Sequence, residues 1–376
     1  MGTSDTSLEY LIIKPASEPQ THEAQLRNAA YWGVKAGVSA EDYLKLNPIL
    51  QQGVFARNGR LKYWVLVPQD DPETTNFFAS CQVMAREVLT LHPAQNVPKS
   101  SFGHAISFVI VPPEHRGKGY ANRFMSLLHS ALAPHRYPNP TKAPTPTDHP
   151  STVSILYSAV GDYYARCAPS VGESGWSRQS SCVTTWPLSS IRISPNKAFV
   201  PPTEFLSESE VTATLDSDDS HIPMELLQLQ KKNPTKTYFA FVPTAPLNAY
   251  SLTMSKLTPD GSSNISWGAQ ISGSRDFMTW VLFDDAGFKL IITRLRASAS
   301  AFPALLGAAL QVAQGARCKG IEVWNIPEHL KEVVRTTGGV TAEREECIPA
   351  FKWYGQESRT ADTDVVWAMN ERYGWC

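Results

Sequence analysis

Apolar and polar residues follow two rhythms along the first half of the chain. Alternating or β-branched and aromatic segments predict strands, and apolar residues three and four positions apart predict helices. The predicted strands are residues 8–16, 60–68, 77–91, 101–112, 152–160 and 176–188, and the predicted helices are residues 21–37, 40–53, 119–134 and 161–167. This order predicts an α/β fold in which a mixed sheet carries helices on both faces.

The second half repeats this rhythm in a weaker form. Its predicted strands are residues 266–272, 276–285, 287–297 and 320–327, and its predicted helices are residues 302–316 and 328–339. From Asn196 to Ser220 the chain becomes rich in proline, serine and acidic residues, which is typical of a connection. We therefore predict two domains, residues 1–195 and 196–376, the second resembling a degenerate copy of the first.

Composition narrows the class of protein. With 376 residues the chain is longer than one compact core usually holds, which supports two domains. The net charge of −1 provides no general attraction for nucleic acid, and no apolar stretch reaches the roughly 20 residues of a membrane helix. The six cysteines lack metal-ligand spacing, so we expect reduced thiols in a cytosolic protein without a metal.

The segment "VPPEHRGKGYANRF" (residues 111–124) leads from an apolar strand into an amphipathic helix. The first amides of a helix have no internal partners, and the helix dipole adds positive potential at that end. Gly117 and Gly119 leave the backbone open to a ligand, and Arg116 and Lys118 add positive charge. The turn therefore predicts an anion site with donors enough for a pyrophosphate.

Two common phosphate loops do not fit this segment. The P-loop needs a longer gap between its glycines and a following Lys-Ser/Thr, and the dinucleotide fingerprint needs a glycine where Asn122 stands. The remaining pattern is Arg-x-x-Gly-x-Gly/Ala, filled by Arg116, Gly119 and Ala121. It resembles motif A of the GCN5-related N-acetyltransferases (GNAT), and the order of elements over residues 8–188 is similar to theirs.

The resemblance implies that acetyl-CoA is the cosubstrate and that this strand and turn hold it. The backbone amides of the turn would bind its pyrophosphate, and the preceding strand would pair with its pantetheine amides. This strand would splay away from the strand at 152–160 to admit the thioester. The residues implied in binding acetyl-CoA are Val109, Val111, Arg116, Gly117, Lys118, Gly119, Tyr120 and Ala121.

The chemistry of amine acetylation needs an acid for the leaving thiolate and a way to neutralise the amine. By the resemblance, Tyr164 in "DYYARCAP" is the acid, with Tyr163 as the alternative. His104 is a candidate base because histidine titrates in the required range. Regular alternation would turn it away from Val109, which shares a face with Ala105 unless a bulge intervenes. Glu87, or a chain of water molecules without a protein base, are the other options.

The end of the chain is rich in aromatic and charged residues. "AFKWYG" (350–355) and the ending "NERYGWC" (370–376), together with "EHRGKGYA", resemble the fungal lysine N6-acetyltransferases, which act on free lysine in its catabolism. Under this resemblance Arg372 would pair with the carboxylate of lysine, Glu371 or Asp364 with its α-ammonium, and aromatic rings would line its stem. The rings are those of Tyr354, Trp353 and Tyr373, and docking of the tail onto the first domain is the alternative role of all these residues.

Three functions remain open from the sequence. The first is acetyl transfer to free lysine. The second is the same reaction on another amine, such as a protein lysine, a polyamine or an antibiotic-like amine. The third is a coenzyme A-binding protein without catalysis. In each case we expect a small-molecule ligand and neither nucleic acid nor a membrane as a partner.

Overall fold

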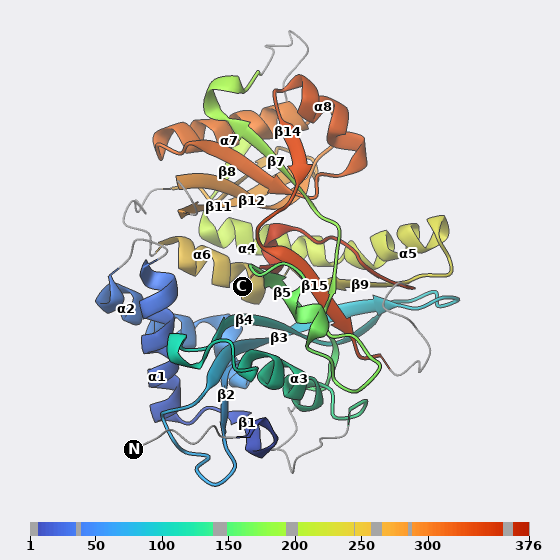
Figure 1. The fold of residues 1–376 in the computed structure, drawn as a ribbon. Helices are drawn as coiled ribbons and strands as arrows, with labels where there is room; N and C mark the ends of the chain where they lie inside the picture. Colours follow the sequence, from blue (N-terminus) through green and yellow to red (C-terminus); the bar gives the residue numbers. More distant parts are fainter. Residues whose placement is uncertain are drawn as a thin grey trace.

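The structure of the protein is a computed structural model that describes residues 7–34, 39–137, 149–192, 202–243, 245–256, 265–284, 288–355 and 364–375. Its strands form two mixed sheets. In Figure 1 the sheet that holds β1 to β5 occupies the lower half of the molecule, and the sheet that holds β7 and β10 to β14 lies above it. Helices α4, α5 and α6 lie between the two sheets.

The first sheet has the order β1-β2-β3-β4-β5-β15-β6, and β9 pairs with both β3 and β16. Most neighbours are antiparallel, but β4 and β5 are parallel. The bounds are β1 Leu11–Pro15, β2 Leu61–Pro68, β3 Ala79–Leu91, β4 Lys99–Ile110, β5 Ser151–Ser158, β6 Ser177–Arg178, β9 Thr237–Phe241, β15 Ile348–Trp353 and β16 Val365–Trp367.

The second sheet has the order β14-β7-β13-β12-β11-β10-β8. Here β12 and β13 are the parallel pair, and the other neighbours are antiparallel. The bounds are β7 Cys182–Pro187, β8 Thr203–Leu206, β10 Gly268–Ile271, β11 Phe277–Asp284, β12 Phe288–Arg296, β13 Gly320–Trp324 and β14 Val340–Glu343.

The helices follow amphipathic segments of the sequence. Helix α3 joins the parallel strands β4 and β5 of the first sheet, and α7 joins the parallel strands β12 and β13 of the second. The parallel pair β9 and β16 is far apart in sequence. The bounds are α1 Glu18–Asn28, α2 Ala40–Gln52, α3 Tyr120–Leu132, α4 Glu208–Asp219, α5 Ile222–Lys232, α6 Ala245–Lys256, α7 Phe302–Gly315 and α8 Lys331–Thr336, and short 3-10 helices include η5 Tyr163–Arg166 and η9 Arg372–Gly374.

The predicted α/β class with mixed sheets is confirmed. One predicted strand, residues 176–188, is wrong, because β6 joins the first sheet and β7 joins the second. The sequence reading also missed α4, which lies in the acidic stretch assigned to the connection. Its start carries a capping box, in which Glu210 accepts from the Ser207 amide at 2.7 Å and Ser207 Oγ accepts from the Glu210 amide at 3.4 Å.

Strands from each half of the chain complete the sheet of the other half. Strand β7 from the first half lies between β13 and β14, and β15 from the second half lies between β5 and β6. The predicted boundary after residue 195 lies outside the described residues. Since backbone hydrogen bonds hold these strands in place, the two halves are tied together by sheet pairing in both directions.

The three largest apolar clusters of the described residues fill spaces between these layers. One lies between the first sheet and α3 and includes Phe124, Leu128 and Ile106. A second cluster, which includes Phe239 and Trp367, covers the opposite face of that sheet. The third packs on the second sheet around Trp280. Helix α3 is therefore anchored along its length by its apolar face, which fixes the position of its first turn.

Candidate active site

The turn between β4 and α3 leaves its backbone open to solvent. Residues 116–119 are exposed, and both glycines adopt left-handed backbone angles, with φ of 76° at Gly117 and 86° at Gly119. Gly119 is the N-cap of α3, and no side chain caps the helix. The turn therefore presents uncapped amides at the positive end of a helix dipole, which suits a phosphate group.

Next to this turn the parallel strands β4 and β5 separate. They pair from Phe102 with Ser151 to Ile106 with Leu156, and both strands then continue without pairing to each other. A bulge in β4 causes the divergence, because Ser107 pairs with Gln82 and Ile110 with Ser80, which leaves one residue of β3 opposite two of β4.

The bulge changes which side chains share a face. Phe108, at φ 51°, packs in the same cluster as Ala105, whereas Val109 packs with α3 on the opposite face. The regular alternation that would place Val109 beside Ala105 is therefore broken at Phe108. Sequence periodicity could not show this, because residues 108–111 are all apolar and leave no alternation from which a bulge could be read.

The separated strands open a pocket of about 490 Å³. It reaches the glycine turn at Arg116, whose Nε donates to the Val111 carbonyl at 3.1 Å. Side chains or backbone of six predicted residues line it: Val109, Val111, Arg116, Ala121, Tyr163 and Tyr164. Tyr120 is instead buried, where its ring stacks on Phe78 at 4.5 Å between centroids, so only its backbone belongs to the turn.

Tyr164 lies on η5 and lines the pocket. The backbone of η5 is held on two sides, since Trp176 N donates to the Tyr164 carbonyl at 3.1 Å and Asn122 Nδ2 of α3 donates to the Arg166 carbonyl at 3.1 Å. Burial raises the pKa of the Tyr164 hydroxyl well above its ordinary value of 10.0. The hydroxyl therefore stays protonated at neutral pH, as a proton donor must.

The two candidate bases lie outside this pocket. His104 is 2% exposed, and burial lowers its pKa to about 3. Glu87 is exposed and accepts from Ser100 Oγ at 2.8 Å. Neither side chain is among those that line the pocket between β4 and β5.

The tail residues Glu371, Arg372 and Tyr373 are engaged with the second sheet and the first sheet. Glu371 pairs with Arg294 and accepts from the Leu295 amide at 3.0 Å. Arg372 is 3% exposed, with its guanidinium 3.7 Å from the centroid of the Trp375 ring. Tyr373 is buried and donates to the Phe241 carbonyl at 2.8 Å.

The other predicted contacts for the acceptor also have structural partners. The hydroxyl of Tyr354 lies 2.7 Å from His129 Nδ1 and 2.8 Å from Ser154 Oγ. Trp353 is 1% exposed, and Asp364 pairs with Lys236 on the surface. The structure brings none of these predicted acceptor residues into the lining of the pocket.

The tail nevertheless reaches the edge of the pocket through Tyr157. A Cβ added to Gly374 would lie 2.9 Å from the Tyr157 hydroxyl, and the Tyr157 ring lies 5.9 Å from that of Trp367. Tyr157 itself lines the pocket. The alternative role of the tail, docking of the second half onto the first, is thus the one its contacts support.

Sequence reasoning missed four aromatic residues of the pocket: Tyr31, Trp32, Phe108 and Tyr157. Tyr31 is 47% exposed although it follows the amphipathic part of α1. The sequence carried no clear signal for them, because single exposed aromatic rings are common on protein surfaces.

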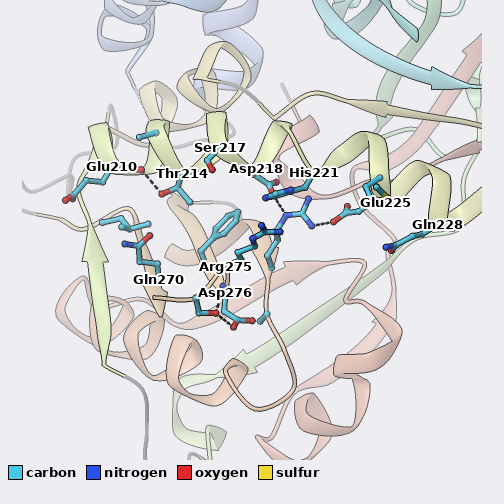
Figure 2. Close-up of a pocket in the computed structure, with 17 residues that line it drawn as sticks. Glu210, Thr214, Ser217, Asp218, His221, Glu225, Gln228, Gln270, Arg275 and Asp276 are labelled. Carbon is cyan, nitrogen blue, oxygen red and sulfur yellow. Dashed lines mark hydrogen bonds and ion pairs between the residues drawn. The ribbon is translucent and has the colours of Figure 1, made fainter. Parts of the chain in front are cut away.

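A second hollow, of about 690 Å³, lies between α4, α5 and the turn that joins β10 to β11 (Figure 2). It shares no lining residue with the pocket at the glycine turn. Among the described residues, no group of His, Cys, Asp and Glu is arranged to hold a metal ion. No helix within the described ranges is long and apolar enough to span a bilayer.

Comparison with known families found one match in sequence. The family described as "LYC1 GNAT-like C-terminal domain" matches residues 185–376, just over half of the chain. A search of curated proteins found no match.

Comparison with solved structures found the same fold at low sequence identity. A GCN5-related N-acetyltransferase from Anabaena variabilis has a TM-score of 0.50 at 12% identity, covering 92% of this chain and 73% of that one. A probable N-acyltransferase from Enterococcus faecalis has 0.52 at 11%, covering 92% and 72%. Eis1 from Mycobacterium abscessus has 0.50 at 12%, covering 92% and 73%.

Proposed function

The chain belongs to the family defined by the LYC1 GNAT-like C-terminal domain and is an acetyltransferase of the GNAT type, and we propose that it transfers the acetyl group of acetyl-CoA to the side-chain amine of free L-lysine. The observation that carries the proposal is the junction of two features. An exposed, uncapped helix start opens directly into a pocket between two separating parallel strands.

The residues of the turn fit a coenzyme A pyrophosphate. Added Cβ atoms show that the space above Gly117 is open, whereas at Gly119 only the Leu8 side chain approaches, at 3.0 Å. Arg116 and Lys118 are exposed beside these amides and add two positive charges. The edges of β4 near Val109 and Val111 would pair with the amides of the pantetheine arm, and this arm would carry the acetyl thioester into the pocket.

The acceptor must lose a proton before it reacts. Neutralising a lysine side chain with a pKa of about 10.4 costs roughly 4–5 kcal/mol at pH 7. The aromatic walls at Trp32, Phe108 and Tyr157 would reduce the hydration of the amine and lower this cost by disfavouring the ammonium. The amine proton leaves to solvent through water molecules, because neither His104 nor Glu87 lines the pocket.

The transfer then exchanges one bond for another. The amine nitrogen bonds to the acetyl carbon, and the carbon–sulfur bond breaks. A backbone amide of β4 near Val109 donates to the carbonyl oxygen while negative charge collects there. The Tyr164 hydroxyl gives its proton to the departing sulfur, so that coenzyme A leaves as a thiol.

Free lysine is favoured over larger acceptors by the family and by the ending of the sequence. The ending "NERYGWC" resembles that of the lysine N6-acetyltransferases, and the matched family carries an LYC1-type C-terminal domain. The tail lies beside Tyr157, at the edge of the pocket, through Gly374 and Trp367. A tail at this edge would leave less room for a peptide chain than for a short amino acid.

An amine panel tests this proposal. The purified chain would be incubated with acetyl-CoA and one of L-lysine, an acetylatable lysine peptide, spermidine or an aminoglycoside, and release of free thiol would be followed. Turnover with lysine alone is the expected result. If only another amine is acetylated, the protein is still an acetyltransferase but its substrate is that amine. If coenzyme A binds tightly and no amine is acetylated, the proposed catalysis is contradicted.

A further inference from the structure

The hollow between α4, α5 and the β10–β11 turn has the size of a ligand site, since small-molecule pockets typically measure about 300–1,000 Å³. Figure 2 shows Glu210, Asp218 and Glu225 along one wall, with Arg275 and Asp276 on the opposite wall. Charges of both signs therefore face one space from two separate elements.

The carboxylates of the hollow already have partners. Asp218 pairs with Arg294, at 2.9 Å between Nε and Oδ2, and also with Arg296. Glu225 pairs with Arg296 as well. Asp276 accepts from the Ser298 amide, and Glu210 is held in the capping box of α4. A carboxylate has about four acceptor sites on its two oxygens, so these groups can still accept from an incoming ammonium.

Two guanidinium groups retain spare donors. Arg296 spends Nε and one terminal nitrogen on Asp218 and Glu225, and its Nη2 is buried without a hydrogen-bond partner among the described residues. Arg275 is exposed and forms no ion pair or hydrogen bond through its side chain within the described ranges. Because a buried donor without a partner is costly, the pair favours an incoming carboxylate.

The overall charge of the hollow excludes a simple anion. Four carboxylates line it (Glu210, Asp218, Glu225 and Asp276) against two guanidinium groups (Arg275 and Arg296), a difference of two negative charges. A phosphate or dicarboxylate would meet repulsion from this surplus. A ligand with one carboxylate and one positive group fits both features. Its carboxylate can accept from the unused N–H groups of the arginines, and its positive group offsets the excess negative charge of the lining.

We propose that this hollow binds a free amino acid, with its carboxylate on Arg275 and Arg296 and its ammonium group toward the carboxylates of α4 and α5. Apolar side chains of the lining, among them Met224 and Phe277, would contact the side chain of the ligand. The site is separate from the acetyl-CoA pocket and goes beyond the proposed function.

A continuous chain of ion pairs leads from this hollow to the tail. Arg296 and Arg294 share Asp218, and Arg294 also pairs with Glu371, which precedes η9. Within η9, Gly374 accepts from Arg86 at 2.5 Å. A carboxylate bound at Arg296 would therefore strengthen a network that holds the tail in place, so ligand binding should also raise the melting temperature.

Three probes with the same six-carbon skeleton test the ligand class. L-norleucine carries both charged groups but no distal amine, hexanoate carries the carboxylate alone, and hexylamine carries the amine alone. In calorimetric titrations of the full chain saturated with coenzyme A, norleucine should bind about tenfold or more tightly than either of the others. Equal binding of hexanoate would overturn the proposed zwitterion, and no binding of norleucine would overturn the site.

A pair of variants tests the location. Arg275→Ala removes an exposed side chain that has no ion pair or hydrogen bond among the described residues, so the chain should fold. We expect norleucine binding to weaken by about tenfold or more. Arg335→Ala is the matched control, because Arg335 is exposed on α8 and pairs with Glu332 on the surface; it should leave binding unchanged. Norleucine affinity that survives Arg275→Ala would place the ligand elsewhere and contradict the inference, whatever the amine panel shows for catalysis.

Discussion

The two sheets contain the same unit, a parallel pair of strands joined through a helix, but the spaces at their turns differ. The first unit opens a pocket between its two strands, whereas the hollow at Arg296 and Ala297 of the second unit lies beside α4 and α5. In the first unit, β4 and β5 part after Ile106 and Leu156, and α3 starts at a bare glycine turn. In the second unit, β12 and β13 pair from Lys289 with Gly320 to Ile292 with Val323, and β12 then continues past its partner. The strand geometry is therefore similar in both.

The two units differ in which residues cover the unpaired end of the first strand and the start of the helix. In the second unit the tail fills this place, because Glu371 accepts from the amide of Leu295 and pairs with Arg294 of β12. Helix α7 begins with the buried Phe302, and Ser298 Oγ accepts from the amide of Ala301. In the first unit these backbone amides are free to bind a ligand. In the second unit the corresponding amides donate hydrogen bonds to side chains of the protein.

The comparison teaches that topology alone does not make a coenzyme site in this fold. The same β-α-β arrangement becomes a binding site only where glycines keep the helix start bare and no other segment occupies the strand edge. The second unit instead serves as an anchor for the tail.

The largest expected effect comes from closing the bare turn. Gly119 has φ 86°, and an added Cβ would lie 3.0 Å from Leu8 Cδ1. Gly119→Asp adds strain, bulk and a negative charge where the pyrophosphate binds, so coenzyme A affinity should fall by about 100-fold or more. Isothermal titration calorimetry with coenzyme A measures this loss of affinity.

Ala299→Asp is the matched control in the second unit, because Ala299 lies exposed in the turn before α7. Coenzyme A affinity should not change there. Equal losses in both variants would remove the distinction between the two turns.

A smaller effect is expected from the proton donor. Tyr164→Phe keeps the ring that lines the pocket and removes the hydroxyl, so kcat should fall by about 100-fold while KM for acetyl-CoA stays nearly constant. Because burial raises the pKa of Tyr164, its hydroxyl should remain protonated near pH 10. The wild-type rate should therefore not fall at that pH through deprotonation of Tyr164.

Tyr163→Phe serves as the comparison, since its ring lies next to Tyr164 in the same pocket. It should lower kcat much less. The reverse order of effects would assign the proton to Tyr163, and unchanged turnover in both variants would exclude a tyrosine donor.

The filled position of the second unit should appear in stability. Glu371→Gln weakens a mostly buried contact with Arg294, whose side chain is 2% exposed. We expect the free energy of unfolding to drop by about 2 kcal/mol, measured by denaturant titration. Glu328→Gln, in an exposed pair with Lys331, should cost much less. A larger loss for Glu328→Gln would mean that the tail contact does not anchor the second unit.

The smallest effect on turnover is expected at His104, which shares the strand of the first unit but not its pocket. His104→Gln should change kcat by less than about fivefold if the protein base is absent. Loss of turnover in a folded variant, with disappearance of an acidic limb from the pH profile, would restore His104 as the base.

The same histidine predicts a pH dependence of stability. The pKa of His104 in the folded chain is about 3, below the ordinary value of 6.5. Between these two pH values, His104 is therefore protonated in the unfolded chain and neutral in the folded chain. Stability from this group is complete above about pH 6.5 and declines as the pH falls toward 3. His104→Gln should make this decline less steep in denaturant titrations between those limits.

Local sequence determined a large part of the fold and of the turn. Richness in β-branched and aromatic residues located β2, β3 and β4, because these strands are buried at most positions. Apolar residues three and four positions apart located α3, which buries one face. The pattern around Arg116, Gly119 and Ala121 located the anion site, because backbone angles and missing side chains are properties of a few adjacent residues. Tyr164 was predicted from the family resemblance, and the structure places it in the lining of the pocket.

Tertiary structure alone decided how the halves combine and what surrounds the site. The single strand predicted over 176–188 divides between two sheets, and β15 crosses into the first sheet, because pairing partners far apart in sequence leave no local signal. The bulge at Phe108 turned Val109 to the other face for the same reason. Glu371 has the same chemistry whether it binds a ligand or an arginine, and only the approach of Arg294 across the fold assigned it to the protein's own structure.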